Sequence, residues 1–259
     1  MEFIDTHTHL TDEAFEGLGG EAVGRALEAG VSKMILADID SGERGPMLEF
    51  AARYPGTVYH MAGLYPGSVD ASWMEEIDRL LPCASAPDTV AIGEIGLDYH
   101  FSTEFKEQQK EALKVQLELA AKLDLPVNIH LRDATEDFFI VLDSCRGLGL
   151  RGNLHAFSGS AETYRRIARY GDWSVGLGGV LTFKNAGIAK EAAEIPLEAI
   201  VLETDAPYLA PTPLRGTRNE SANIPLIAAK LADIKGISVE EVARATTFNA
   251  KRLFTRISE

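Results

Sequence analysis

The stretch Phe3-Ile4-Asp5-Thr6-His7-Thr8-His9 begins as a short apolar strand and leads directly into two histidines. His7 and His9 are separated by one residue, so on an extended backbone their side chains point to the same side and can reach one metal ion together. Taken alone, such a pair fits a metal site and two solvent-facing polar residues about equally well. The rest of the chain decides between these interpretations, because the same pattern recurs.

Short apolar runs of strand type alternate along the chain with longer amphipathic stretches of helix type, as expected of repeated βα units with a parallel sheet. The eight predicted strands cover residues 3–5, 33–37, 58–63, 90–93, 127–129, 152–154, 174–176 and 200–202. The chain has 259 residues and no linker-like or repetitive segment. We therefore predict a single α/β domain, residues 1–259, with a TIM-barrel-like (β/α)8 fold.

The clearest predicted helix covers residues 104–123, a Glu/Lys/Gln-rich segment with apolar residues at helical spacing. Thr103 is its predicted N-cap. The segment 225–254 is predicted to form two more helices, and Ser238 followed by Glu241 predicts a capping box at the start of the second. These helices belong to the outer ring of the predicted barrel.

Five of the predicted strands lead into residue types that bind metals. In chain order these are His7 with His9, Glu94, His130, His155 and Asp205. In a parallel barrel the carboxyl ends of all strands meet on one face, where the active sites of this fold lie. Taken alone, His130 is more typical of a hydrogen-bonded core histidine, but chance explains poorly why four of the six histidines fall at strand ends. We therefore predict one metal centre built from these six residues.

Glu94 and Asp205 are predicted to take part in the chemistry as well as in metal binding. The two oxygens of Glu94 can each bind a cation, so it can bridge two metal ions roughly 3.5 to 4 Å apart. A glutamate held in an internal salt bridge is the alternative. Asp205 follows an apolar strand and suits both a metal ligand and the base that takes a proton from the attacking water. The predicted cofactor is two divalent ions, of which Mg²⁺, Mn²⁺ and Zn²⁺ all suit mixed His and carboxylate ligands.

Three arginines are candidates for binding phosphate oxygens beside the metals. Arg132 follows His130 by two residues, which favours a functional role. For Arg215 surface solvation is an equally good explanation, and for Arg218 it is the better one. Ser158-Gly159-Ser160 fits an anion-binding turn or a simple helix cap. No nucleophile triad, Walker loop or dinucleotide fingerprint competes, because Gly176-Leu177-Gly178-Gly179 lacks the required spacing.

Composition narrows the class of partner and the compartment. The net charge of -14 argues against broad nucleic-acid binding, although bound divalent ions would make one cleft locally positive. Cys83 and Cys145 lack the spacing of a thiolate site, which fits a reducing compartment. No basic leader and no run of 18 apolar residues is present, so we expect a cytoplasmic protein without a membrane span. Oligomeric state leaves no pattern in the sequence.

With these residues in place, the chain resembles the TatD family of metal-dependent deoxyribonucleases, part of the wider amidohydrolase-like barrels, nearly from end to end. The resemblance rests on Asp5-Thr6-His7-Thr8-His9, on GEIGLDY at residues 93–99, on IHLRDA at 129–134, on HAFSG at 155–159, and on ETDAPYLAP at 203–211 followed by RGTRNE at 215–220.

The resemblance implies a division of labour among the six residues. His7, His9 and Asp205 would hold one metal, His130 and His155 the second, and Glu94 would bridge them. It also implies hydrolysis of phosphodiester bonds in DNA, often by removal of nucleotides from an end, with Mg²⁺ or another divalent ion. DNA ends or single-stranded DNA are the partners that it implies.

One departure from the family concerns the substrate. The family usually has Gly-x-His-Pro-His after its third strand, with the first histidine near the substrate phosphate, but this chain has Gly63-Leu64-Tyr65-Pro66-Gly67. Tyr65 is expected to replace that histidine as a neutral hydrogen-bond donor to substrate. Asn219-Glu220 is followed by Ser221 rather than by the usual proline. These changes keep the metal ligands and leave the substrate open.

Two alternatives to a nuclease follow. The same metal centre can hydrolyse another ester or amide, such as the ester of a D-aminoacyl-tRNA, a lactone or a small phosphoester. A non-catalytic binding protein with a vestigial barrel is the weaker alternative, because every expected ligand is present.

Overall fold

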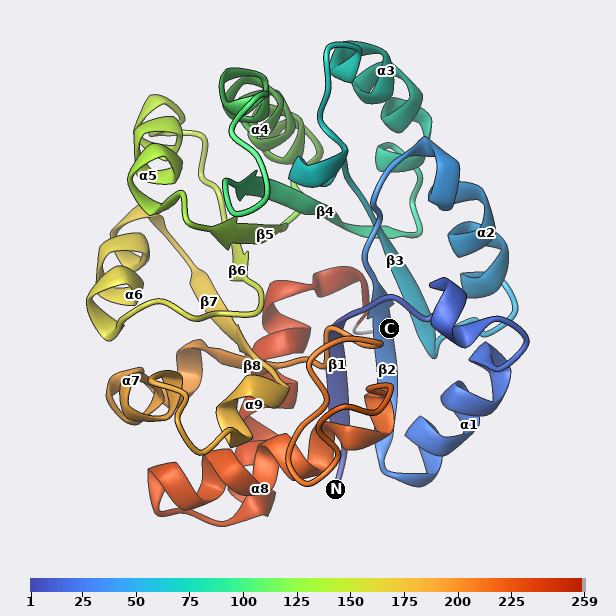
Figure 1. Ribbon diagram of the computed structural model, residues 1–259, viewed down its shortest axis with the longest axis vertical. Helices are drawn as coiled ribbons and strands as arrows, with labels where there is room; N and C mark the ends of the chain where they lie inside the picture. Colours follow the sequence, from blue (N-terminus) through green and yellow to red (C-terminus); the bar gives the residue numbers. More distant parts are fainter. Residues whose placement is uncertain (258–259) are drawn as a thin grey trace.

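Eight parallel strands follow one another around the molecule in chain order, β1 to β8, and the helices form a ring outside them (Figure 1). This computed structural model describes residues 1–257. The strands are β1 (Phe3–Thr8), β2 (Val31–Leu36), β3 (Val58–Ala62), β4 (Thr89–Asp98), β5 (Val127–Arg132), β6 (Gly152–Leu154), β7 (Trp173–Leu177) and β8 (Ile200–Leu202). The predicted TIM-barrel-like (β/α)8 fold is confirmed.

The barrel closes between its first strand and the segment that follows its last. The amide of Asp205 donates to the carbonyl of His7 at 2.9 Å, and the amide of His9 donates to the carbonyl of Ala206 at 2.7 Å. These hydrogen bonds place the two ends of the sequence side by side. His7, His9 and Asp205 therefore become neighbours through the backbone itself.

All eight predicted strands are present, and the largest difference lies in β4. This strand was expected to end at Gly93 but runs to Asp98, because its second half keeps pairing with β5 from Ile95 opposite Ile129 onward. One extra residue on β4 between Ile92 and Ile95 forms a bulge. His7, Glu94 and His130 lie within β1, β4 and β5, which corrects the expectation that they follow their strands.

The outer ring contains the helices α1 (Gly19–Glu28), α2 (Ser41–Ala51), α3 (Trp73–Ala84), α4 (Lys106–Leu123), α5 (Thr135–Ser144), α6 (Ala161–Ile167), α7 (Ile188–Glu194), α8 (Ile224–Lys235) and α9 (Val239–Leu253). Short 3-10 turns cover Glu13–Phe15, Pro66–Ser68, Ala168–Tyr170, Gly179–Thr182, Leu197–Ala199, Ser221–Asn223 and Thr255–Ile257. No helix within residues 1–257 combines the length and the apolarity that crossing a membrane requires.

Helix ends show one wrong and one confirmed prediction. Thr103 is not the cap of α4, because its carbonyl accepts from the amide of Lys106 at 3.3 Å in a turn that precedes the helix. The N-cap position is Phe105, which makes no side-chain cap. At the start of α9 the predicted capping box is confirmed, since the Ser238 side chain accepts from the amide of Glu241 and the Glu241 carboxylate accepts from the amide of Ser238.

The amino-terminal end of the barrel is filled by apolar side chains from the strands and from the end of the chain. This cluster is buried and includes Ile4, Ile35, Met61, Val201, Leu253, Phe254 and Ile257. A larger apolar cluster lies between the sheet and the helices. Both Cys83 and Cys145 are buried as free thiols.

Candidate metal centre

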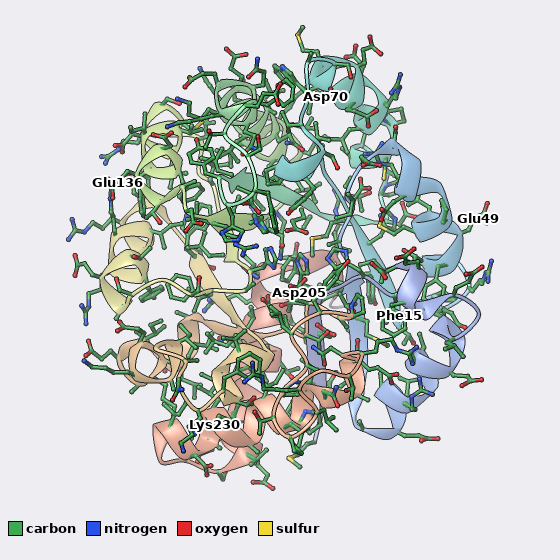
Figure 2. The ribbon with its side chains drawn as sticks, in the orientation of Figure 1. Phe15, Glu49, Asp70, Glu136, Asp205 and Lys230 are labelled. Carbon is green, nitrogen blue, oxygen red and sulfur yellow. The ribbon has the colours of Figure 1, made fainter. Side chains whose placement is uncertain are left out.

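Six side chains of metal-binding type converge at the carboxyl ends of the strands. His7 projects from β1, Glu94 from β4 and His130 from β5, whereas His9, His155 and Asp205 come from the segments after β1, β6 and β8. Figure 2 shows Asp205 at the centre of the ring of strands, with other labelled charged residues around the outside. Three overlapping groups have ligand atoms within 4.8 Å of one another: His7, His9 and Glu94; His7, His155 and Asp205; and Glu94, His130 and His155.

The carboxylate of Glu94 faces a different pair of histidines with each oxygen. Its Oε1 lies 2.8 Å from Nδ1 of His130 and 2.8 Å from Nε2 of His155. Its Oε2 lies 3.4 Å from Nε2 of His7 and 3.7 Å from Nε2 of His9. Glu94 therefore stands between two sets of nitrogen ligands, one at each oxygen.

Asp205 adds a second carboxylate to one of these sets. Its Oδ1 lies 3.6 Å from Nε2 of His7 and 3.5 Å from Nε2 of His9. The two Nε2 atoms of His7 and His9 are 3.1 Å apart, and Nδ1 of His130 is 3.2 Å from Nε2 of His155. Ligand atoms on one ion at about 2.0–2.2 Å lie roughly 3–3.5 Å from each other. The donor atoms therefore fit divalent cations.

Two buried polar residues orient the histidine rings. Nδ1 of His7 lies 2.8 Å from Oδ1 of Asn128, and Nε2 of His130 lies 2.9 Å from Oδ2 of Asp98. Each oxygen can accept a ring N–H, and with that nitrogen protonated the other ring nitrogen would be free to offer its lone pair to a bound cation. Sequence analysis missed both residues. Their signal was the even spacing from a ligand on the same strand: Asp98 follows Glu94 by four residues, and Asn128 precedes His130 by two.

Electrostatics keep both carboxylates of the centre ionised. Burial alone would raise the pKa of Glu94, but the imidazoles of His155 and His7 and hydrogen bonds from His130 and His155 hold it well below its usual range. Burial would also raise the pKa of Asp205, but a hydrogen bond from His9 and the charge of His7 outweigh burial and lower it. The centre therefore presents two anionic carboxylates among imidazoles, a donor set that attracts cations.

Glu203 is a third carboxyl group behind the centre, which sequence analysis also missed. It is fully buried, accepts a hydrogen bond from the amide of Ala156, and lies 3.9 Å from Nδ1 of His155. Burial raises its pKa to about 8 despite the opposing charge of His7. Gly176 makes room for it, because a Cβ there would lie 1.9 Å from Oε2 of Glu203. The glycine-rich Gly176-Leu177-Gly178-Gly179 thus has a packing role.

Tyr65 lies against His130 at the edge of the centre. Its hydroxyl donates to Oδ2 of Asp98 at 3.4 Å, and its ring meets the His130 ring edge-on with centroids 5.1 Å apart. Burial and the charges of Glu94 and Asp98 raise the pKa of Tyr65, so its hydroxyl stays protonated. The expected neutral donor is present, and its contact with substrate stays a prediction.

Arg132 borders a polar cavity next to the centre. The cavity has a volume of about 450 Å³ and is lined by His100, Arg132, His155 and Ser158 among others. The guanidinium carbon of Arg132 lies 5.1 Å from the centre of the Phe101 ring. Because His155 belongs both to the cavity and to the candidate metal centre, the cavity opens beside the candidate ligands.

The other predicted substrate contacts differ in their surroundings. Arg215 lies over the ring of Phe183, with its guanidinium carbon 4.1 Å from the ring centre. Arg218 is partly buried and donates to the carbonyl of Ala14 at 2.9 Å and to Glu220 at 2.7 Å, so it has a structural role in place of the surface solvation favoured from the sequence. Ser160 caps α6 by accepting from the amide of Thr163 at 3.1 Å, so the plain-cap interpretation applies to it.

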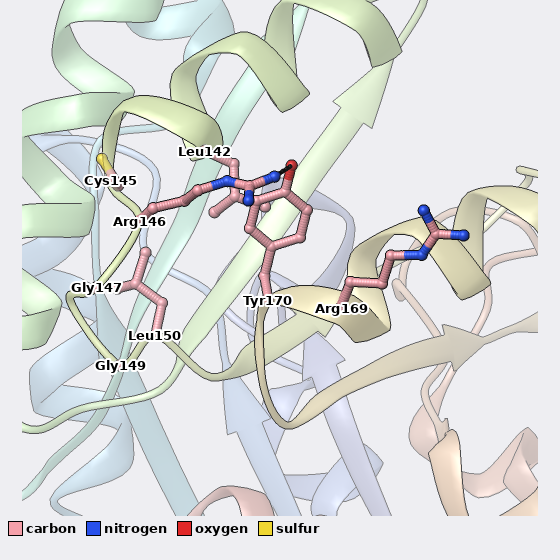
Figure 3. Close-up of a pocket in the computed structure, with 8 residues that line it drawn as sticks. All are labelled: Leu142, Cys145, Arg146, Gly147, Gly149, Leu150, Arg169 and Tyr170. Carbon is pink, nitrogen blue, oxygen red and sulfur yellow. Dashed lines mark hydrogen bonds between the residues drawn. The ribbon is translucent and has the colours of Figure 1, made fainter.

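A further cavity lies at the opposite end of the barrel (Figure 3). Its lining comes from α5 and from the segments just before β6 and β7, so it opens near the amino ends of the strands. Arg146 donates to the hydroxyl of Tyr170 at 3.3 Å across it, while Arg169 points away. This cavity contains none of the candidate metal ligands.

Comparison with known proteins gives one consistent result. The model of the family described as TatD related DNase matches residues 4–255. The chain is 38% identical to an uncharacterised metal-dependent hydrolase, YabD, of Bacillus subtilis over 254 residues, covering 97% of this chain and 98% of the relative. It is 33% identical over 259 residues to a protein of Salmonella typhimurium named 3'-5' ssDNA/RNA exonuclease TatD, covering 97% of this chain and 98% of that protein.

A solved structure shows the same fold. The crystal structure of the TatD homologue YjjV from Escherichia coli superposes with a TM-score of 0.88 at 30% sequence identity, covering 98% of each chain. Nearly the whole length of this chain therefore has a counterpart in the fold of that protein.

Proposed function

This chain belongs to the TatD-related DNase family of metal-dependent hydrolases, and we propose that it is an exonuclease-like deoxyribonuclease that cleaves phosphodiester bonds at ends of single-stranded DNA. The substrate class rests on relatives named 3'-5' ssDNA/RNA exonuclease and on the cavity beside the metal centre. The single observation that carries the proposal is the carboxylate of Glu94 between two pairs of histidines.

The proposal assigns two divalent ions to the centre. His7, His9 and Asp205 would hold one, His130 and His155 would hold the other, and Glu94, whose two oxygens face both sets, would contribute to each. Such ions polarise a phosphodiester and make water a stronger acid. Mixed histidine and carboxylate sites accept Mg²⁺, Mn²⁺ and Zn²⁺, so all three belong in the test.

Asp205 is the proposed general base. Its side chain is 17% exposed, compared with 4% for Glu94, so of the two carboxylates it is the more accessible to entering water. Its lowered pKa keeps it ready to accept a proton at neutral pH. Glu94 would contribute one carboxylate oxygen to each set of ligands. Asp205 thus orients the attacking water and takes its proton.

Arg132, Arg215 and Tyr65 are the proposed substrate contacts. Arg132 lines the cavity next to His155 and can pair with a phosphate oxygen. Tyr65 offers a neutral donor beside His130. A net charge of -14 argues against broad nucleic-acid binding and sliding along a duplex, so substrate contacts are expected near the candidate metal centre, where bound divalent ions would supply positive charge.

Tyr65 also favours a second candidate function. A neutral donor in place of the family histidine suits an uncharged scissile group, such as the carboxylic ester of a D-aminoacyl-tRNA or a lactone, and a small phosphoester is a further alternative. The metal centre would be the same, and only the preferred substrate would differ.

The deciding experiment compares these substrates with one protein preparation. Single-stranded DNA and RNA labelled at either end, aminoacyl-tRNA and small esters are incubated with Mg²⁺, Mn²⁺ or Zn²⁺, and Glu94→Gln is run in parallel. We expect metal-dependent shortening of single-stranded DNA by the parent and none by Glu94→Gln. Faster Glu94-dependent turnover of a small ester or aminoacyl-tRNA would reject the nuclease as the main activity.

A further inference from the structure

Phe101 is an exposed aromatic side chain next to the candidate metal centre. It lies three residues after the end of β4, and 81% of it is exposed, more than any other large apolar side chain within residues 1–257. Single exposed apolar residues are common on protein surfaces, so exposure alone carries no conclusion. What distinguishes Phe101 is the set of groups that hold and surround it.

One carboxylate ties the segment that carries Phe101 to a candidate metal ligand. Oδ2 of Asp98 lies 2.9 Å from Nε2 of His130, and Oδ1 of the same group accepts from the amide of His100 at 2.8 Å. The ring of His100 meets the ring of Phe101 edge-on, with centroids 4.8 Å apart. The position of Phe101 is therefore set relative to the metal centre through Asp98.

Phe101 also borders the cavity that reaches His155. Both His100 and Arg132 line that cavity, and both contact the Phe101 ring. The guanidinium of Arg132, 5.1 Å from the ring centre, adds positive charge beside an aromatic surface. An exposed aromatic ring with an adjacent cation is how proteins bind unpaired bases and the phosphates between them.

We propose that Phe101 is a stacking platform for one unpaired nucleobase of the substrate, with the neighbouring phosphate held against Arg132. The inference rests on the proposed nuclease function and deepens it. Inside a duplex the faces of each base are covered by its stacked neighbours, so an unpaired base of a single strand reaches this ring more readily. Phe101 thereby makes single-stranded ends the preferred substrate.

The test removes the ring and the base separately. Phe101→Ala, Phe101→Trp and the parent are assayed on a single-stranded octanucleotide and on versions in which one abasic residue is moved along the strand. Phe248→Ala is the matched control, because Phe248 is 64% exposed on α9. Its neighbour Asn249 bonds to the carbonyl of Ile200 at the amino end of β8, which places Phe248 away from the barrel mouth.

For Phe101→Ala we expect KM on the intact strand to rise roughly tenfold or more, as loss of base stacking requires, while kcat changes little. Phe101→Trp and Phe248→Ala should keep the parent KM. At one position the abasic residue should raise the parent KM by a similar factor, and Phe101→Ala should add nothing further there. Thermal unfolding of Phe101→Ala should match the parent, since the ring is exposed.

Failure of the stacking platform and failure of the proposed nuclease function give different results. If the parent shortens single strands but Phe101→Ala keeps the parent KM, or raises KM equally on every abasic substrate, the stacking platform is rejected and the nuclease stands. If the parent cleaves no oligonucleotide but shows Glu94-dependent turnover of a small ester, the proposed nuclease itself is rejected, and the platform with it.

Discussion

Asp98 and His130 form a hydrogen-bonded pair in which Nε2 of the ring lies 2.9 Å from Oδ2 of the carboxylate. The pair directs Nδ1 of His130 toward Oε1 of Glu94, 2.8 Å away. Asp98 is buried, and its backbone amide is held by the side chain of Gln109 at 3.0 Å. The orientation of the candidate ligand His130 thus depends on Asp98, which is not itself one of the six candidate ligands.

Asp98→Ala should weaken binding of the second metal. Without the acceptor, the His130 ring is free to turn and loses basicity at Nδ1, and partners of this type typically contribute about 10–100-fold in metal affinity. Isothermal titration of metal-free protein with Zn²⁺ or Mn²⁺ measures the change. Asp70→Ala, on the exposed surface, is the control. Unchanged affinity in Asp98→Ala would contradict the orienting role.

Glu94→Gln should reduce the metal content from two ions to one or none and lower turnover by at least about 100-fold, more than loss of an outer partner costs. The amide keeps one oxygen and so cannot offer an anionic oxygen to each pair of histidines. Metal analysis of the purified variant, together with its activity, tests this expectation. Two tightly held ions in the variant would show that Glu94 does not bridge them.

Tyr65→Phe should separate substrate binding from metal binding. The hydroxyl is 3.4 Å from Asp98, a long hydrogen bond whose loss leaves metal affinity almost unchanged. If the hydroxyl donates to substrate, kcat/KM should fall by about 5- to 30-fold, corresponding to about 1–2 kcal/mol. A large fall in metal affinity with normal kcat/KM at saturating metal would instead assign Tyr65 to the centre.

Gly176→Ala should destabilise the fold, because the new Cβ would lie 1.9 Å from the buried carboxyl of Glu203. Overpacking of this kind costs about 1–3 kcal/mol, which lowers Tm by roughly 2–4 °C for each kcal/mol in a domain of this size. Gly187→Ala is the matched control, since it has φ -60 and no atom within 4 Å of its Cβ position. Equal Tm values for the two variants would contradict the tight contact.

Chelation should lower thermal stability, and added metal should restore it. Ions that bind only the folded state stabilise it by about 2.7 kcal/mol per site at a free concentration of 100 times Kd. Differential scanning calorimetry with EDTA and then with excess Mn²⁺ measures the shift. The shift should be smaller in Glu94→Gln, and an equal shift in that variant would mean that the metal acts elsewhere.

Sequence periodicity predicted the barrel because each strand and helix is a local pattern. The strands β6 and β8 appear with the predicted bounds, and the capping box at Ser238 appears with both of its hydrogen bonds. The start of α4 was predicted wrongly, because the backbone turn from Thr103 to Lys106 competes with a local capping preference. A capping preference read from the sequence fails where a neighbouring turn already uses the backbone of the expected cap residue.

The sequence by itself determined the order of the strands and the six residue types that meet at their carboxyl ends. Only the tertiary structure decided that Glu94 turns one oxygen to His130 and His155 and the other to His7 and His9. It also decided the partners Asp98, Asn128 and Glu203. These contacts depend on the bulge in β4 and on the packing of separate strands, which fix distances between residues far apart in the chain.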